Sequence, residues 1–138
     1  MKRTLVALPL LLLTGCSTPL TPAKLSPSFR EVFSGLYVEQ QRMLGRDALD
    51  AKGLHVLASC QRTGNDATGP GEDWICGVQY VDLGTSAAQT FELQVKADGC
   101  WKADGQPATQ PATLVDPLTQ RSRTNPLAEF DGCLDTSW

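Results

Sequence analysis

The 138-residue sequence has few of the residues from which catalytic and metal sites are usually built. It contains one histidine, His55, and no Cys-x-x-Cys pair, which argues against a zinc knuckle. No nucleophile elbow, phosphate-binding loop or HExxH segment occurs in it. Basic residues are also fewer than acidic ones, with 12 Lys and Arg and 15 Asp and Glu. A net charge of −3 argues against a nucleic-acid partner.

The apolar segment over residues 5–13 falls well short of the roughly 20 residues that a transmembrane helix needs. A Lys-Arg pair before it and small residues after it are typical of a secretory signal peptide. The segment ends in Leu13-Thr14-Gly15-Cys16. This run resembles the lipobox of bacterial lipoproteins, which has an aliphatic residue, two small residues and an invariant cysteine. The resemblance implies that residues 1–15 are removed and that Cys16 becomes an acylated N-terminus.

Acylation of Cys16 would tether the mature chain to the extracytoplasmic side of the cell membrane, or to the outer membrane if the cell is Gram-negative. Removal of residues 1–15 takes away two positive charges and leaves a net charge near −5, so attraction to anionic lipid is expected to add little. Residues 16–27 contain three prolines and are predicted to form an extended tether. Membrane lipid is therefore the first expected partner.

Cysteine is the residue whose count is most informative. With Cys16 set aside, four cysteines remain, and an even set in an exported chain predicts two disulfides. Free thiols or a metal site are the alternatives, and four cysteines allow three pairings. The four are Cys60, Cys76, Cys100 and Cys133.

The favoured pairing follows from two strand-like segments, residues 54–60 and 74–81, which flank a polar, glycine-rich stretch. If they pair antiparallel around Thr68, Cys60 lies opposite Cys76. The same register brings two further pairs of side chains onto one face, Ala58 with Val78 and Val56 with Tyr80. We therefore predict a Cys60–Cys76 disulfide, which leaves Cys100–Cys133 as the second.

Residues 28–103 are predicted to form an α+β domain in which one amphipathic helix packs on a three- or four-stranded antiparallel meander. Ser28 and Glu31 have the spacing of a capping box, so the helix is expected to begin near Ser28. One face of this helix is apolar except for a glutamine. That face consists of Phe29, Val32, Phe33, Leu36, Gln40, Met43 and Leu44. We interpret it as a core-packing face, with a partner-binding or membrane-lying helix as the alternative.

A third strand is predicted over residues 90–97, where apolar and polar residues alternate. Its expected register on the second strand puts Phe91 beside Tyr80, after a polar loop over residues 82–89. An Asp-Gly turn then leads into a short fourth strand over residues 100–103. The inward residues of the third strand are Phe91, Leu93, Val95 and Ala97.

Residues 104–138 contain four of the nine prolines and are predicted to be an irregular tail, which a Cys100–Cys133 disulfide ties back across the domain. Acidic residues beside the predicted strands could ligate calcium, but they lack the alternating ligands of an EF-hand loop. We expect turn and capping roles for these residues, which are Glu72, Asp73, Asp131 and Asp135.

No catalytic residue is predicted. His55 falls on the open face of its strand, as an ordinary surface residue. Trp74 and Trp101 are the candidate ligand surface, for example for a peptidoglycan fragment. Trp74 shares the side of Cys76, so the simpler interpretation is that it packs on the disulfide. Trp101 has the opposite parity to Cys100 and is expected to be partly exposed.

The run Trp74-x-Cys76, then Phe91-x-Leu93-x-Val95-x-x-Asp98-Gly99-Cys100-Trp101, resembles the C-terminal half of small secreted lipoproteins common in actinobacteria. The resemblance implies a fold and a location, and it carries over no catalytic residue. The sequence thus favours a non-enzymatic, membrane-tethered binding or accessory module without a cofactor or metal, whose partner is an envelope protein or peptidoglycan. A small envelope hydrolase, or an inhibitor or assembly factor, is the alternative.

Overall fold

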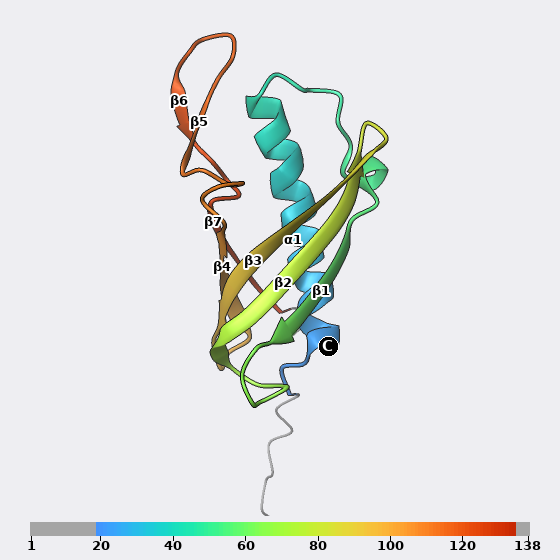
Figure 1. Cartoon of the computed structure of the whole chain (residues 1–138), viewed down its shortest axis with the longest axis vertical. Helices are drawn as coiled ribbons and strands as arrows, with labels where there is room; N and C mark the ends of the chain where they lie inside the picture. The colour runs from blue at the N-terminus through green and yellow to red at the C-terminus, as the bar shows by residue number, and fades with distance from the viewer. Residues whose placement is uncertain (1–18, 135–138) are drawn as a thin grey trace, which may run out of the picture.

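The computed structural model describes residues 19–134 (Figure 1). Its helices are α1 (Pro22–Met43) and the 3₁₀ helix η1 (Ala51–Leu54). Its strands are β1 (Leu57–Arg62), β2 (Gly71–Asp82), β3 (Thr85–Val95), β4 (Cys100–Gly105), β5 (Thr113–Val115), β6 (Ser122–Thr124) and β7 (Glu129–Cys133). The predicted signal peptide and acylation site, Cys16, lie outside the described residues, as does Asp135.

The main sheet is antiparallel, with the strand order β1-β2-β3-β4-β7, and α1 lies across one of its faces (Figure 1). The predicted α+β class, with one helix packed on an antiparallel sheet, is confirmed. The segment after β4 is more regular than predicted, because it forms the β5–β6 hairpin and then returns as β7, a fifth strand beside β4. Pairing with β4 satisfies backbone groups that an irregular tail would leave open.

The helix begins at Pro22, six residues before the predicted start at Ser28. The extended tether predicted over residues 16–27 is therefore wrong from Pro22 onward. Proline suits the first turn of a helix, because the N–H that it lacks would have no partner there and its fixed φ is already helical. Leu25 in this turn is only 1% exposed, so its packing on the sheet holds the early start in place.

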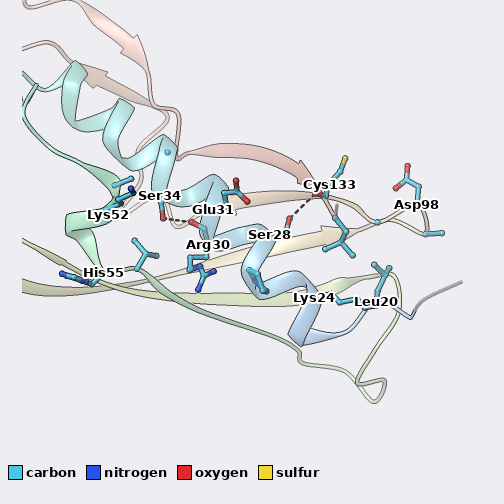
Figure 2. Close-up of a pocket in the computed structure, with 17 residues that line it drawn as sticks. Leu20, Lys24, Ser28, Arg30, Glu31, Ser34, Lys52, His55, Asp98 and Cys133 are labelled. Atoms are coloured by element: carbon cyan, nitrogen blue, oxygen red, sulfur yellow. Dashed lines mark hydrogen bonds between the residues drawn. The ribbon is translucent and has the colours of Figure 1, made fainter. Parts of the chain in front are cut away.

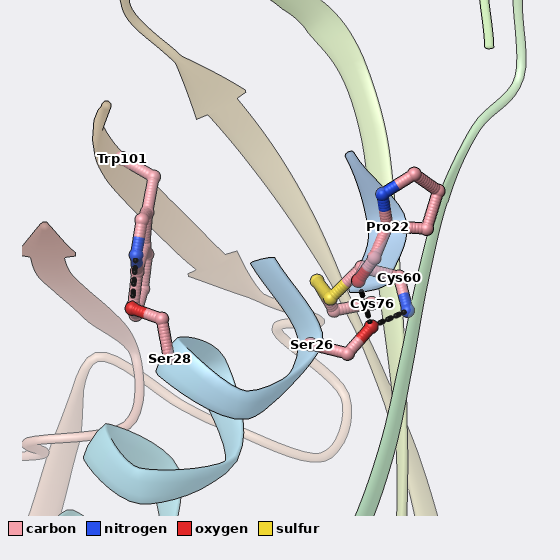
Figure 3. The surroundings of a disulfide bond; sticks show 6 residues. All are labelled: Pro22, Ser26, Ser28, Cys60, Cys76 and Trp101. Carbon is pink, nitrogen blue, oxygen red and sulfur yellow. Dashed lines mark hydrogen bonds between the residues drawn. A yellow bond between two sulfur atoms is a disulfide. The ribbon is translucent and has the colours of Figure 1, made fainter. Parts of the chain in front are cut away.

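Both predicted disulfides are confirmed. Cys60 lies directly opposite Cys76 across β1 and β2, and Cys100 lies opposite Cys133 across β4 and β7. Ser26 of α1 lies beside the first disulfide, where its hydroxyl accepts a hydrogen bond from the Cys60 N–H at 2.9 Å (Figure 3). The helix is thereby tied to the edge strand of the sheet.

The predicted register of β1 on β2 is also confirmed for Ala58, which lies opposite Val78. The start of β1 differs from the prediction, because the strand begins at Leu57 and leaves Val56 outside it. His55 is not in a strand at all, since it ends η1 in the left-handed conformation with a φ of 48°. An extended strand cannot include that backbone conformation.

The strand β3 is shifted by four residues along β2 relative to the prediction. Phe91 lies opposite Cys76 and not beside Tyr80, because the two strands continue up to a tight turn at Leu83 and Gly84. Both turn residues have positive φ, 49° and 77°, as a two-residue hairpin turn requires. The polar loop predicted here is therefore wrong. A shift by an even number of residues keeps each side chain on its face, so Phe91 is still buried.

The core between α1 and the sheet is centred on Phe29. Its ring centroid lies 5.4 Å from that of Phe91, 5.6 Å from Trp101 and 5.7 Å from Phe130. Trp101 is only 2% exposed, so the predicted partial exposure is wrong: β7 and α1 cover the ring. Its indole Nε1 donates a hydrogen bond to the Ser28 hydroxyl at 3.0 Å (Figure 3).

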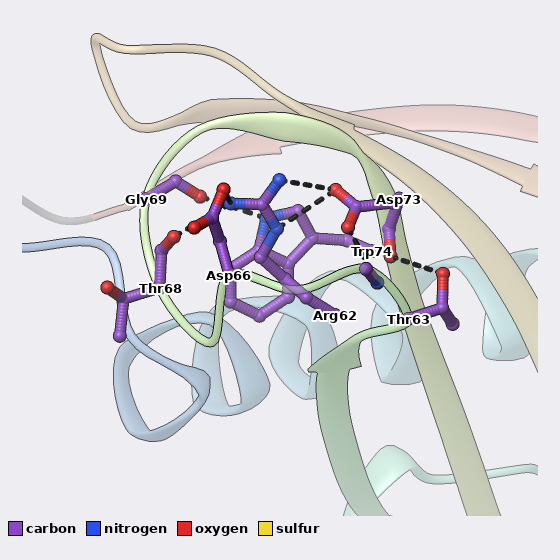
Figure 4. A network of polar contacts seen from close by, with 8 residues as sticks. Arg62, Thr63, Asp66, Thr68, Gly69, Asp73 and Trp74 are labelled. Atoms are coloured by element: carbon purple, nitrogen blue, oxygen red, sulfur yellow. Dashed lines mark hydrogen bonds and ion pairs between the residues drawn. The ribbon is translucent and has the colours of Figure 1, made fainter.

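Trp74 is 1% exposed, as its core-packing interpretation predicts. Its Nε1 donates to the carbonyl of Gly69 at 3.0 Å, and the Arg62 guanidinium lies over its ring (Figure 4). Arg62 also donates to Asp73 at 2.6 Å and to the Thr68 carbonyl at 2.8 Å. The guanidinium holds the pKa of Asp73 below its usual value. These contacts close the loop between β1 and β2. Asp73, which is predicted to be a turn residue, lies instead within β2, and it holds the loop through its side chain.

Buried amide side chains connect α1 to the segment between β4 and β7. Gln40 donates to Oε1 of Gln110 at 2.8 Å and to Oδ1 of Asn125 at 2.9 Å. Asn125 also donates to Gln110 at 3.0 Å, and Gln110 donates to Gln89 of β3 at 2.6 Å. Within residues 19–134, every buried side-chain nitrogen and oxygen has a hydrogen-bond partner. The network explains why a glutamine occupies the otherwise apolar face of the helix.

Candidate functional site

A groove of about 1040 Å³ runs along the side of α1 that faces away from the sheet (Figure 2). The segment from Ala51 to Val56 forms one wall. The turn at Ala97–Gly99 and the end of β7 at Cys133 and Leu134 form the other. We call this feature the α1 groove. It is open to solvent, and the residues that line it come from parts of the chain that are far apart in sequence.

Three cations line the α1 groove: Lys24, Arg30 and Lys52. None of them forms an ion pair with a carboxylate of residues 19–134, in contrast to Arg46, which is 2.6 Å from Asp82. Figure 2 shows Arg30 and Lys52 toward the η1 end of the groove and Lys24 at the other end. The cationic side chains are therefore free to meet an anionic ligand.

Two carboxylates, those of Glu31 and Asp98, also line the α1 groove. One of them is already engaged, because Asp98 accepts a hydrogen bond from the backbone N–H of Cys100 at 2.9 Å within its own turn. This bond comes from a neutral donor and leaves the charge of Asp98 in place. Three cations against two carboxylates give the groove lining a net charge of +1, in a chain whose acids outnumber its bases.

Small residues, Ser28, Ser34 and Gly35, lie among the charged ones on the part of α1 that lines the groove. An ideal Cβ on Gly35 would meet no atom within 4 Å, so the space above this residue is open. Glycine at an exposed position inside a helix costs about 1 kcal/mol relative to alanine, and no packing contact demands it here. The nearby serines have hydroxyls that are turned to backbone carbonyls: Ser34 donates to Arg30 at 2.7 Å, and Ser28 donates to Cys133 at 3.3 Å.

His55 also lines the α1 groove, and it is exposed. Among residues 19–134, no hydrogen bond joins its imidazole to a serine or to a carboxylate. A nucleophile beside an oriented base is the arrangement that acyl-transfer chemistry requires. The groove can bind a ligand by charge and shape, and its described residues do not form that catalytic arrangement.

The predicted ligand surface at Trp74 and Trp101 is wrong, because both indoles are buried in the core. A second hollow, of about 730 Å³, adjoins Trp101 on β4 and β7, but this residue is 2% exposed and offers almost no surface to it. The cations of the α1 groove were not predicted as site residues. Their only signal in the sequence is their position off the core face of the helix, as for Lys24 and Arg30.

Fold and groove together define a small disulfide-bonded α+β domain in which one helix covers a five-stranded sheet. Neither described helix combines the length and hydropathy needed to cross a membrane. Over the described residues, no cluster of three or more His, Cys, Asp or Glu side chains is arranged to hold a metal ion. The chain matches no protein-family model, no curated protein and no solved structure.

Proposed function

We propose that this chain is a membrane-anchored lipoprotein of the cell envelope, and that its α+β domain is a non-enzymatic binding module. The observation that carries the proposal is the pairing of the cysteines. The four that follow Cys16 are all joined in two disulfides, so the folded domain uses every one of them. Cys16 stands apart from this set, at the end of a run with every feature of a lipobox.

The short distance between Cys16 and the domain supports the same proposal. The chain is already fixed at Leu20, whose carbonyl accepts a hydrogen bond from the Gly69 N–H at 2.8 Å. Four residues span at most about 14 Å when fully extended. An acyl group on Cys16 would therefore hold the domain close to the lipid surface, where envelope components are its natural partners.

Binding is favoured over catalysis by the chemistry of the α1 groove. Its serine hydroxyls are bonded to backbone carbonyls, and its three cations, Lys24, Arg30 and Lys52, outnumber its two carboxylates. Such a lining attracts anions and has no oriented base to activate a nucleophile. The partners that fit are anionic envelope components, such as lipid headgroups, the carboxylates of peptidoglycan, or an acidic protein surface.

Metabolic labelling with an alkyne-bearing fatty acid tests the anchor directly. The full-length chain is expressed in a bacterium that processes lipoproteins, beside the variants Cys16→Ser and Ser17→Ala. We expect label in the wild type and in Ser17→Ala, because both keep the thiol and the run before it, and no label in Cys16→Ser. An unlabelled wild type, or equal labelling of Cys16→Ser, would contradict the proposal.

A further inference from the structure

We propose that the α1 groove is a membrane-docking face, which binds the anionic headgroups of the same bilayer that holds the acyl anchor. This inference rests on the proposed acylation of Cys16 and goes beyond it, because an anchor alone leaves the orientation of the domain undetermined. The face is defined by the unpaired cations of the groove, Lys24, Arg30 and Lys52. Headgroup phosphates are the anions that it would meet.

The two sides of the domain differ in charge. The open face of the sheet, opposite α1, carries four exposed or half-buried carboxylates on β3, β4 and β7, against two cations, Lys102 and Lys96, the second of which directly follows β3. Lys102 is itself neutralised by Glu129 at 2.8 Å. The carboxylates of this face are Glu92, Asp104, Glu129 and Asp131. An anionic bilayer therefore repels the sheet side and attracts the helix side, although the net charge of the chain is negative.

The position of the groove selects the membrane as its occupant over a dissolved anion. Leu20 lines the groove and lies only four residues after Cys16, so an acylated Cys16 would hold this face near the bilayer. Headgroups then act at a high effective concentration, and a weak attraction is enough to orient a domain that cannot diffuse away. Each basic residue near an anionic surface contributes about a fivefold factor to binding.

The apolar residues of the groove indicate how deep the contact goes. Its two leucines, Leu20 and Leu134, are buried and half-buried, and its other apolar residues, such as Pro27 and Val56, are smaller. The exposed large apolar side chains of the described residues, such as Leu83 and Leu118, do not line the groove. The face thus has no wedge to insert between acyl chains. It would rest on the headgroup layer, and its contact should weaken as salt screens the charges.

Amine labelling of the reconstituted lipoprotein tests the docking. The acylated full-length protein, its acylation verified by mass, is placed in vesicles of phosphatidylcholine with or without phosphatidylglycerol. An amine-reactive reagent then reports the exposure of Lys24 and Lys52 in the groove and of Lys102 on the sheet. We expect slower labelling of Lys24 and Lys52 on the anionic vesicles, reversed by high salt, and no change at Lys102.

Arg30→Glu and Arg123→Glu form a matched pair, because both arginines are exposed and neither forms an ion pair with a described carboxylate. Arg30→Glu should weaken the protection of Lys52 by about fivefold or more, and Arg123→Glu, on β6, should leave it unchanged. Equal labelling on both vesicles, or equal effects of the two variants, would overturn the docking proposal and leave the anchor proposal intact. A protein without an acyl group would overturn both.

Discussion

The contact between Gly132 and Trp101 offers the sharpest test of how β7 completes the core. An ideal Cβ on Gly132 would lie 2.5 Å from Cζ2 and 2.8 Å from Cε2 of the Trp101 indole. Ordinary contact begins near 3.4 Å, so in Gly132→Ala the ring must retreat by about 0.9 Å. It has little room, because it is 2% exposed and packs against Phe29 and Phe130.

The expected cost of Gly132→Ala has two parts. A retreat of the indole breaks the 3.0 Å hydrogen bond from its Nε1 to Ser28, which is worth about 1 kcal/mol. Overpacking of an enclosed site typically costs about 1–3 kcal/mol more. The free energy of unfolding should therefore fall by about 2–4 kcal/mol.

Urea unfolding of the oxidised protein, followed by tryptophan fluorescence, measures this difference. Gly77→Ala is the matched control, because Gly77 also lies in a strand but an ideal Cβ there meets nothing within 4 Å. We expect Gly77→Ala to keep or slightly raise the stability. If Gly132→Ala were as stable as Gly77→Ala, the packing of Trp101 against β7 described above would be refuted.

Three further perturbations test other parts of the domain. Gln40→Leu should lower the free energy of unfolding by about 2–3 kcal/mol in urea titrations, because it removes two buried hydrogen bonds; an unchanged midpoint would contradict the network. Arg46 lowers the pKa of Asp82 to about 2, so the contribution of Asp82 to thermal stability should be complete above about pH 5 and be lost between about pH 5 and pH 2, and Asp82→Asn should remove that part of the fall. Replacing Cys100 and Cys133 together by alanine should cost about 3–4 kcal/mol, measured by the same unfolding assay, and a loss below about 1 kcal/mol would show that this disulfide adds little.

The pH prediction follows from the arrangement around Asp82. Arg46 donates to both of its carboxylate oxygens at 2.6 Å, and the Tyr37 hydroxyl donates to Oδ2 at 2.6 Å. Hydrogen bonding to Arg46 is the main cause of the low pKa of Asp82. A group whose pKa is lowered by folding contributes stability above its unfolded pKa and loses it as the pH falls through the folded pKa.

The local patterns predicted much of the domain. The pairing of Cys60 with Cys76 could be predicted because both strands alternate cleanly, and the register that joins the cysteines also gathers the apolar residues on one face. The register of β3 could not, because Leu83 and Gly84 form the hairpin turn without the Asn-Gly or Asp-Gly signature of such turns. Leucine rarely adopts a positive φ, so local conformational preference does not predict a turn at Leu83.

The site was harder to predict than the fold. The α1 groove depends on three segments that meet only after folding, and Arg30 and Lys52 have no motif that links them. The burial of Trp101 depends on β7, a five-residue strand whose Gly132 gives no strand signal. Tertiary packing decides both features, so neither could be inferred from the periodicity of one segment.

The mass of the mature protein purified from membranes tests the proposed anchor most directly. We predict a chain that begins at Cys16, carries a diacylglyceryl group on that residue, and has its remaining four cysteines oxidised in pairs, with Cys60 linked to Cys76 in the peptide map. A mature chain that begins at another residue, or one in which Cys16 carries no lipid, would contradict the assignment of this protein as a lipoprotein.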